Sequence, residues 1–263
     1  MTMDIVIVGA GNLATSLAHA LYNAGHAIKA VFSRTIDHAT ELANKVHAIP
    51  YDDISRLPAD ADVYIVAVKD DVISQVAKEL RICSPNAFIV HTAGTVSVEV
   101  LPKGRRGVFY PMQTFSKQRI VEFSHIPLFL EAEHTDDELL LDIMASSISD
   151  QIFHIKGEKR KVLHLAAVFC CNFANHCAAI ADNILSENGI PFSVMVPLID
   201  ETVAKLHQCT PLQAQTGPAV RNDLNVIRQH IEQLKNNGHK DFADIYDILS
   251  KSVINLHQST EKR

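Results

Sequence analysis

Residues 4–14 read Asp4-Ile5-Val6-Ile7-Val8-Gly9-Ala10-Gly11-Asn12-Leu13-Ala14, and this stretch decides the fold. The unbroken β-branched run at positions 5–8 is typical of a strand covered on both faces in a parallel sheet. Gly9 permits a tight turn, and Gly11 lets the backbone approach a pyrophosphate closely. Ala14 takes the place of the third glycine in the pattern G-x-G-x-x-G/A, where it still allows a helix to pack closely on the strand.

A helix is predicted from this turn to about Ala24, with Gly25 at its C′ position. The free N–H groups of its first turn would face the phosphates of a bound dinucleotide. Strand, glycine turn and helix in this order predict a dinucleotide-binding site. To this site we assign first Gly9, Gly11, Asn12 and Leu13. The alternative is a glycine turn that binds no ligand.

The second predicted strand, residues 28–33, ends in Ser33-Arg34-Thr35. An NAD site usually has an acidic residue about 20 positions after the glycine motif, where it binds the ribose hydroxyls. Here Arg34 could instead pair with a 2′-phosphate, while Ser33 or Thr35 donates to the same group. The pattern favours NADP over NAD. The alternative is that Arg34 is a solvated loop charge and that Thr35 only caps the next helix.

Strands and helices continue to alternate as far as residue 155. Further strands are predicted at 48–51, 61–68, 87–91, 108–110, 126–131 and 152–155. Helices are predicted at 36–46, at 72–80 after an Asp71 N-cap, and from about Asp136, where Thr135 and Glu138 have capping-box spacing. This order predicts an α/β fold with a mainly parallel, doubly wound sheet.

Ligands of such sheets bind at the carboxyl ends of the strands, so the loops there should surround one cleft together with the glycine motif. Ordinary turn chemistry is the alternative for each loop. From these loops we assign to the cofactor Val68, Lys69, Thr92 and Gly94, and to the substrate Gln113.

The sequence pattern changes after Gly157. The strand signal ends, residues 162–185 predict one long and largely apolar helix, and residues 193–208 predict another. Apolar residues repeat at helical spacing over 220–234 and again over 242–256. We therefore expect a Rossmann domain at 1–156 and an all-helical substrate and dimerisation domain at 157–263.

The long helix carries a narrow polar stripe. At about 100° per residue, Lys161, His164, Asn172 and Asn175 fall within roughly 60° of one direction. Polar groups on a buried helix need partners, water or a ligand. Facing the cleft, His164 or Lys161 would supply a proton and Asn172 would hold a carbonyl, with Asn175 near the substrate. The alternative is that the stripe only fixes the angle between the domains.

A second candidate lies at Thr216-Gly217-Pro218-Ala219-Val220-Arg221-Asn222-Asp223. Thr216 and Pro218 predict the start of a helix. Arg221 could bind a carboxylate of the substrate, and Asp223 suits the positive end of the helix. Helix capping alone is the alternative.

Composition excludes several classes. The net charge of −6 and the pI near 6.1 give no reason to expect nucleic acid or an anionic membrane. No apolar run is expected to span a bilayer, and the N-terminus has no signal-peptide pattern. Five cysteines, an odd number without C-x-x-C, indicate reduced thiols in the cytoplasm. The 14 histidines do not form zinc-ligand spacing, so no metal site is predicted.

The glycine motif and Ser33-Arg34-Thr35 resemble the N-terminal domains of deazaflavin-dependent NADP oxidoreductase and pyrroline-5-carboxylate reductase. The whole chain more closely resembles a bacterial family that joins a Rossmann-like domain to a helical C-terminal domain of unknown function. The shared stretches are 91–94, 110–115, 161–167 and 216–223. Such proteins are described as NADP oxidoreductases without a known substrate. Family members often have Ser at position 93 and His at position 110, where this chain has Ala93 and Tyr110.

Two functions fit these features. The first is an NADP-dependent oxidoreductase that transfers hydride between NADP(H) and a small carbonyl, imine or hydroxy compound. The second is a non-catalytic NADP-binding sensor whose helical domain reports occupancy to a partner protein. A homodimer through the helical domain is expected from the family architecture and the number of apolar helices.

Overall fold

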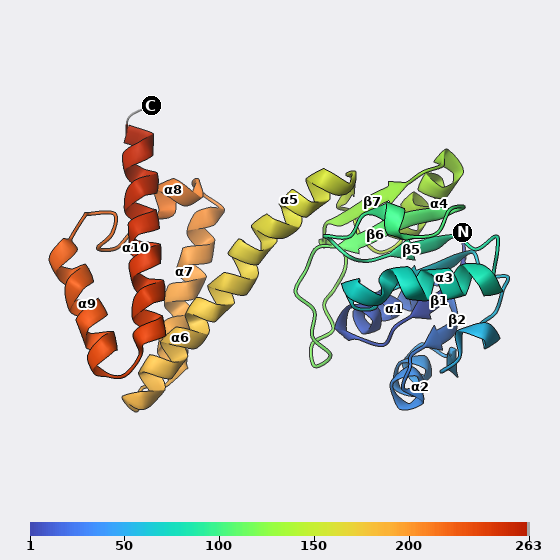
Figure 1. Cartoon of the computed structure of the whole chain (residues 1–263), viewed down its shortest axis with the longest axis horizontal. Coiled ribbons are helices and arrows are strands. Elements are labelled where there is room, and N and C mark those ends of the chain that lie inside the picture. Colours follow the sequence, from blue (N-terminus) through green and yellow to red (C-terminus); the bar gives the residue numbers. More distant parts are fainter. Residues whose placement is uncertain (262–263) are drawn as a thin grey trace. The chain divides into compact units, whose positions relative to one another are not determined.

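The computed structural model describes residues 1–261 and divides the chain into two compact units, Met1–Asn172 and Phe173–Arg263 (Figure 1). The boundary between the units lies inside a long helical segment, whereas the sequence pattern changes at Gly157. The start of that segment therefore belongs to the first unit, together with the sheet.

The first unit is built on one sheet with strand order β3-β2-β1-β4-β5-β6-β7-β8. Every neighbouring pair is parallel except β6 and β7. The strands are β1 Asp4–Val8, β2 Ala27–Phe32, β3 Ile49–Tyr51, β4 Val63–Val66, β5 Ile89–His91, β6 Arg106–Pro111, β7 Leu128–Ala132 and β8 Ile152–His154. The predicted mainly parallel, doubly wound sheet is confirmed.

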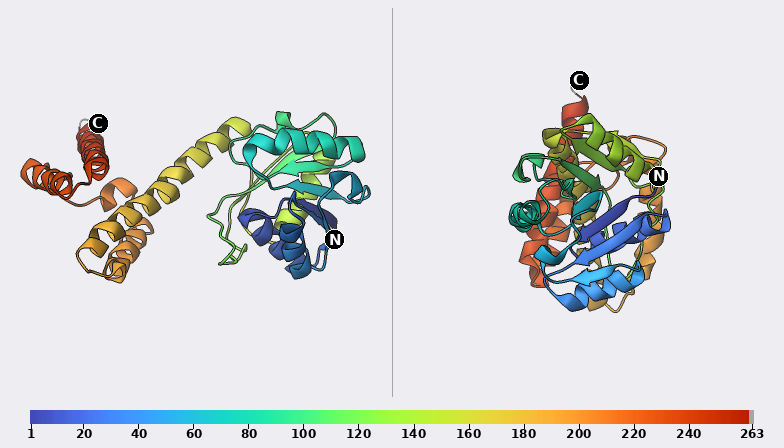
Figure 2. Two further views of the ribbon diagram at one scale, coloured as in Figure 1. Left: turned by 60° about the horizontal axis from the view of Figure 1, so that its bottom comes forward. Right: turned by 90° about the vertical axis from the view of Figure 1, so that its right-hand side faces the viewer.

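Helices cover both faces of this sheet (Figure 2). One face packs against α1 (Asn12–Asn23), α2 (Ile36–Lys45) and α4 (Thr135–Ser146). The other packs against α3 (Ile73–Cys83) and against Leu163 of α5 (Gly157–Ala167). Alternate residues of β1 serve the two cores, with Ile5 and Ile7 on one side and Val6 and Val8 on the other. Two buried faces explain why β1 is an unbroken apolar run.

The predicted starts of two helices differ from the structure. Asp71 does not cap α3, because residues 70–72 form the short 3-10 helix η2 (Asp70–Val72) before it. Thr135 is the first residue of α4 and no side chain caps that helix, so the predicted capping box is wrong. The first turn of α4 still carries Asp136, Asp137 and Glu138, which lie at the positive end of the helix dipole.

The long helical segment contains α5, a π-helical stretch at Val168–Phe173, and α6 (Ala174–Glu187). A π-helix has i→i+5 bonds, so the regular spacing that placed Asn172 on a stripe with Lys161 and His164 does not hold there. The segment Gly157–Glu187 has 31 residues, and its most apolar 18-residue window has a mean hydropathy of 1.4. By length and composition this is enough to cross a membrane. By these two criteria, length and composition, the expectation that no run is long enough was wrong.

The second unit is helical throughout its described part. After α6 come the 3-10 helix η5 (Phe192–Met195), α7 (Val196–Leu206), α8 (Pro211–Ala214), α9 (Leu224–Asn236) and α10 (Lys240–Glu261). The helices α9 and α10 pack side by side, with Ile227 and Ala243 buried. Across them, His230 Nδ1 and the Tyr246 hydroxyl lie 2.8 Å apart.

Candidate functional site

The glycine turn after β1 is held close to the end of β4. Gly9 has φ +123°, and a Cβ atom there would lie 2.2 Å from the Ala67 carbonyl oxygen and 3.3 Å from Val68 Cγ1. Only glycine fits this position. Gly11 differs, because a Cβ atom at Gly11 would meet no atom within 4 Å. The turn therefore has a packed side at Gly9 and an open side at Gly11, in front of the N-terminus of α1.

This open side has the properties of a phosphate cradle. Gly11 is the N-cap residue of α1, its position has no capping side chain, and the first turn of the helix carries no acidic residue. The N–H groups of the first turn, which include Asn12 and Leu13, are left without an intrahelical partner. These residues fit a dinucleotide pyrophosphate on both space and charge.

Ser33, Arg34 and Thr35 follow β2 at the same edge of the sheet. Ser33 Oγ accepts a hydrogen bond of 3.3 Å from the Thr35 N–H. Thr35 is the N-cap residue of α2, yet its side chain makes no capping bond. Arg34 lines a hollow of about 430 Å³ together with Asp52, Asp53 and Glu79. Within residues 1–261 the Arg34 guanidinium has no ion-pair partner.

Two hydrogen bonds join the glycine turn and the three predicted loops in two pairs. Asn12 Nδ2 donates to the Phe115 carbonyl at 3.1 Å, which links the glycine turn to the loop after β6. Thr95 Oγ1 donates to Asp70 Oδ2 at 2.7 Å, which links the loops after β5 and β4. Lys69 is exposed just before η2, and the buried Thr92 N–H donates to the Val66 carbonyl.

The loop after β5 contacts a tyrosine–histidine pair. The Tyr110 hydroxyl, at the end of β6, lies 3.1 Å from Nδ1 of His164 on α5. A Cβ atom at Gly94 would lie 2.7 Å from His164 Nδ1 and 2.8 Å from Tyr110 Cζ. Gly94, assigned from the sequence to the cofactor, thus leaves room for these two rings. Tyr110 makes a hydrogen bond although it replaces the histidine that the family often has.

A buried arginine fixes the start of α5 against the sheet. Arg160 is 1% exposed, pairs with Glu131 of β7 and donates to the Val96 carbonyl. Residues four apart lie on one face of a helix, so Arg160 turns the face that carries His164 towards Tyr110. Burial, followed by the charge of Arg160, lowers the pKa of His91 to about 3, so this buried histidine is neutral at pH 7. Its Nδ1 accepts from the Ala93 N–H at 3.2 Å.

Other predicted residues of the first unit have local partners. Lys161 Nζ lies 2.8 Å from Glu158 Oε1 and the side chain is largely exposed. Gln113 Oε1 accepts from the Thr114 N–H at 2.8 Å. Asn172 is exposed in the π-helical stretch. The structure brings His164 together with Gly94, but it pairs Lys161 and Gln113 with their own chain neighbours.

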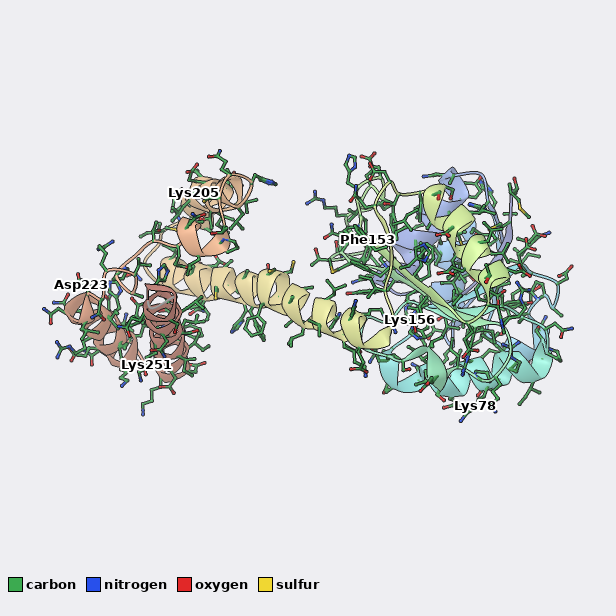
Figure 3. The ribbon with its side chains drawn as sticks, turned by 90° about the horizontal axis from the view of Figure 1, so that it is seen from above. Lys78, Phe153, Lys156, Lys205, Asp223 and Lys251 are labelled. Atoms are coloured by element: carbon green, nitrogen blue, oxygen red, sulfur yellow. The ribbon has the colours of Figure 1, made fainter. Side chains whose placement is uncertain are left out.

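The remaining predicted residues lie in the second unit. Asn175 is exposed on α6. The helix predicted to begin near Pro218 begins at Leu224, because Asn222 has a left-handed φ of 52° and ends the preceding turn. Asp223, labelled in Figure 3, is the N-cap of α9 and accepts from the Val226 N–H at 3.2 Å. Thr216 therefore caps no helix, and Arg221 lies exposed in the turn.

Sequence reasoning missed Tyr110, Arg160 and His91 as parts of this region. The sequence carried two signals for Tyr110 and His91, which end strands at the ligand edge of the sheet and lie in stretches that resemble the family. For Arg160 the signal was its place one turn before His164. Among residues 1–261, no group of three or more His, Cys, Asp or Glu side chains could hold a metal ion.

Residues 4–94 match the family described as NADP oxidoreductase coenzyme F420-dependent, and residues 126–253 match a domain of unknown function (DUF2520). A Bacteroides fragilis protein described as a "putative NADP oxidoreductase" is 45% identical over 97% of this chain and 98% of its own, with a TM-score of 0.90. The chain belongs to the same family. The family predicted from the sequence is thereby confirmed. Its members are oxidoreductases that bind a nicotinamide dinucleotide.

Two further solved structures are similar to this chain. A Thermotoga maritima protein is 26% identical, with 98% of this chain and 100% of that chain covered and a TM-score of 0.71. An imine reductase from Myxococcus stipitatus in complex with NADP⁺ is 16% identical, covers 97% and 95% of the two chains, and has a TM-score of 0.67. The likeness to the imine reductase shows the fold alone. No curated protein matches the chain.

Proposed function

We propose that this family member is an NADP-dependent oxidoreductase that transfers hydride between NADP(H) and a small carbonyl, imine or hydroxy compound. The observation that carries the proposal is the Tyr110–His164 pair against Gly94, at the edge of the sheet where the glycine turn lies. It supplies a proton-bearing group where a parallel sheet binds its ligands. The cofactor, when bound, supplies the hydride chemistry.

Cofactor binding is assigned to three groups of residues. The turn at Gly9, Gly11, Asn12 and Leu13 would hold the pyrophosphate, with Val68, Lys69, Thr92 and Gly94 in the adjoining loops. Arg34, with Ser33 and Thr35, would hold the 2′-phosphate of NADP. The absence of an ion-pair partner for Arg34 in residues 1–261 supports this role, since a free guanidinium is available for a bidentate phosphate contact.

The choice of NADP is tested with Arg34→Ala. Charge-assisted hydrogen bonds contribute about 1.5–3 kcal/mol, so NADPH affinity should fall roughly 10- to 100-fold while NADH affinity changes little. Arg56→Ala, which removes another exposed arginine, is the matched control and should leave both affinities unchanged. Equal protection of the wild-type protein by NADPH and NADH against thermal unfolding would refute the role of Arg34.

In catalysis, His164 would donate the proton to the substrate oxygen or nitrogen. Lys161 is the other acid that the sequence suggests, and Asn172 would orient the substrate. Gln113, Asn175, Arg221 and Asp223 are proposed to contact the substrate. Asp223 also has a structural role as an N-cap, so its substitution should lower stability as well.

Turnover distinguishes the enzyme from a non-catalytic NADP sensor. A screen of small carbonyl, imine and hydroxy compounds with NADP(H) should find a substrate, and His164→Asn should abolish its turnover without lowering NADPH affinity. Absence of turnover with every compound, together with tight NADPH binding, would favour the sensor.

We also propose a homodimer formed by the helical unit, in the cytoplasm and free of membrane and nucleic acid. Large apolar side chains of this unit are exposed, among them Leu198 at 63% and Val203 at 51%. A second copy is the simplest cover, since most soluble oligomers are symmetric homo-oligomers. Sedimentation should give twice the mass of the chain. A monomer that floats with lipid vesicles would contradict this proposal.

A further inference from the structure

The Tyr110 hydroxyl lies 3.1 Å from Nδ1 of His164, within hydrogen-bond distance. The Tyr110 ring stacks on Phe129 in the core on the side of the sheet that α3 covers, and the residue is 7% exposed. Burial raises the pKa of Tyr110, against a smaller opposing effect of the Arg160 charge. The phenol therefore keeps its proton at neutral pH, and its O–H is free to act as a donor.

A donor at Nδ1 determines where a neutral imidazole carries its own proton. Of the two ring nitrogens one donates and the other accepts. If Nδ1 accepts from the Tyr110 O–H, the proton of neutral His164 lies on Nε2. The two rings are 6.1 Å apart between centroids and tilted by 54°, an arrangement in which the hydroxyl reaches the ring edge.

The pair is held by its surroundings on two sides. The bare Cα of Gly94 lies against both rings, so closely that a larger residue would force a ring to move. One turn before His164, Arg160 is tied to Glu131 and to the Val96 carbonyl. These contacts fix α5 in rotation and fix the ring of Tyr110, so the hydrogen bond is built into the fold of the first unit.

We propose that Tyr110 is a positioning residue that holds His164 in its Nε2–H tautomer and replaces the proton that His164 gives to the substrate. The first part of this proposal, the tautomer, stands on the structure alone. The second part, the replacement of the proton, rests on the proposed function. The Nε2–H bond breaks as the substrate oxygen or nitrogen, which has accepted hydride from the reduced nicotinamide cofactor, takes the proton. The Tyr110 proton moves to Nδ1, and the resulting phenolate, near the positive charge of Arg160, is reprotonated by water.

The tautomer is measured directly, without a substrate. Long-range ¹H–¹⁵N spectra of histidine-labelled protein, with the His164 signals assigned by their loss in His164→Asn, should show the proton on Nε2. Tyr110→Phe, which removes only the hydroxyl, should lower the Nε2–H to Nδ1–H ratio about five-fold. Tyr64→Phe removes another buried tyrosine hydroxyl, which is bonded to the Pro58 carbonyl, and should leave His164 unchanged.

Activity tests the second part separately. With a substrate found by screening, Tyr110→Phe should lower kcat roughly 10- to 100-fold with little change in KM or NADPH affinity, and should change the pH profile of kcat. A wild-type His164 with its proton on Nδ1 overturns the inference whatever the activity. If the tautomer is as proposed but His164→Asn keeps full turnover, the proton-transfer role and the proposed function of His164 both fail, while the structural assignment stands.

Discussion

Alanine should lower thermal stability when it replaces Gly9 of the opening motif, but NADPH affinity when it replaces Gly11. At Gly9 the new Cβ would lie 2.2 Å from the Ala67 carbonyl oxygen and 2.9 Å from the Ala67 carbonyl carbon, both backbone atoms that cannot rotate away. The φ of +123° adds strain for any L-residue. About 1–3 kcal/mol for the backbone conformation and about 1–3 kcal/mol for overpacking give a loss of about 4 kcal/mol.

For a domain of this size each kcal/mol shifts Tm by about 2–4 °C, so Gly9→Ala should lower the Tm of the first unit by about 8–16 °C. Gly11→Ala is the matched control. Its φ is −81° and its Cβ would meet no atom, so Tm should change by less than about 2 °C. Because that Cβ would enter the space assigned to the pyrophosphate, NADPH affinity should fall roughly 10- to 100-fold.

Differential scanning fluorimetry with and without NADPH measures both effects, since a ligand that binds only the folded state raises Tm according to its affinity. A Gly9→Ala protein that keeps its Tm would refute the steric reasoning. A Gly11→Ala protein that keeps its full NADPH-induced shift would refute the placement of the pyrophosphate over this turn.

Three further predictions concern groups around the tyrosine–histidine pair. Arg160→Met leaves the Glu131 carboxylate without its partner and should lower the free energy of unfolding in urea by about 3–5 kcal/mol. The double variant that also carries Glu131→Gln should recover most of this loss. Equal stability of the single and the double variant would exclude an ion-pair effect. Because the folded-state pKa of His91, about 3, lies below its unfolded value near 6.5, the folded protein loses stability as pH falls from about 6.5 towards 3. The loss from this group is about 2 kcal/mol between pH 7 and pH 5, and His91→Asn should remove that part of the dependence; identical pH profiles would contradict the burial argument. Gly94→Ala should displace one of the two rings and reduce the His164 tautomer preference, which the same NMR spectra would detect.

The sequence by itself determined the fold class and the family. The runs at 5–8 and 61–68 predict strands buried on both faces, which the structure has at 5–8 and 63–66. The G-x-G-x-x-A turn fixes its own geometry because Gly9 needs a positive φ that only glycine adopts readily. These signals are local, lying within one strand, one turn or one helix. Caps failed at Asp71 and Thr216, where a short 3-10 helix or a left-handed residue moved the helix start by a few positions. The cap also failed at Thr135, which is itself the first residue of α4.

Only the tertiary structure decided which side chains meet. Tyr110 and His164 are 54 positions apart, and their contact depends on the sheet order that places β6 beside β5 and on the burial of Arg160, which sets the rotation of α5. By contrast, Lys161 pairs with Glu158 and Asp223 caps its own helix, each with a partner three residues away in the chain. Residue type limits what a side chain can do, and where the partner is not local, as for Tyr110 and His164, packing between distant segments sets it.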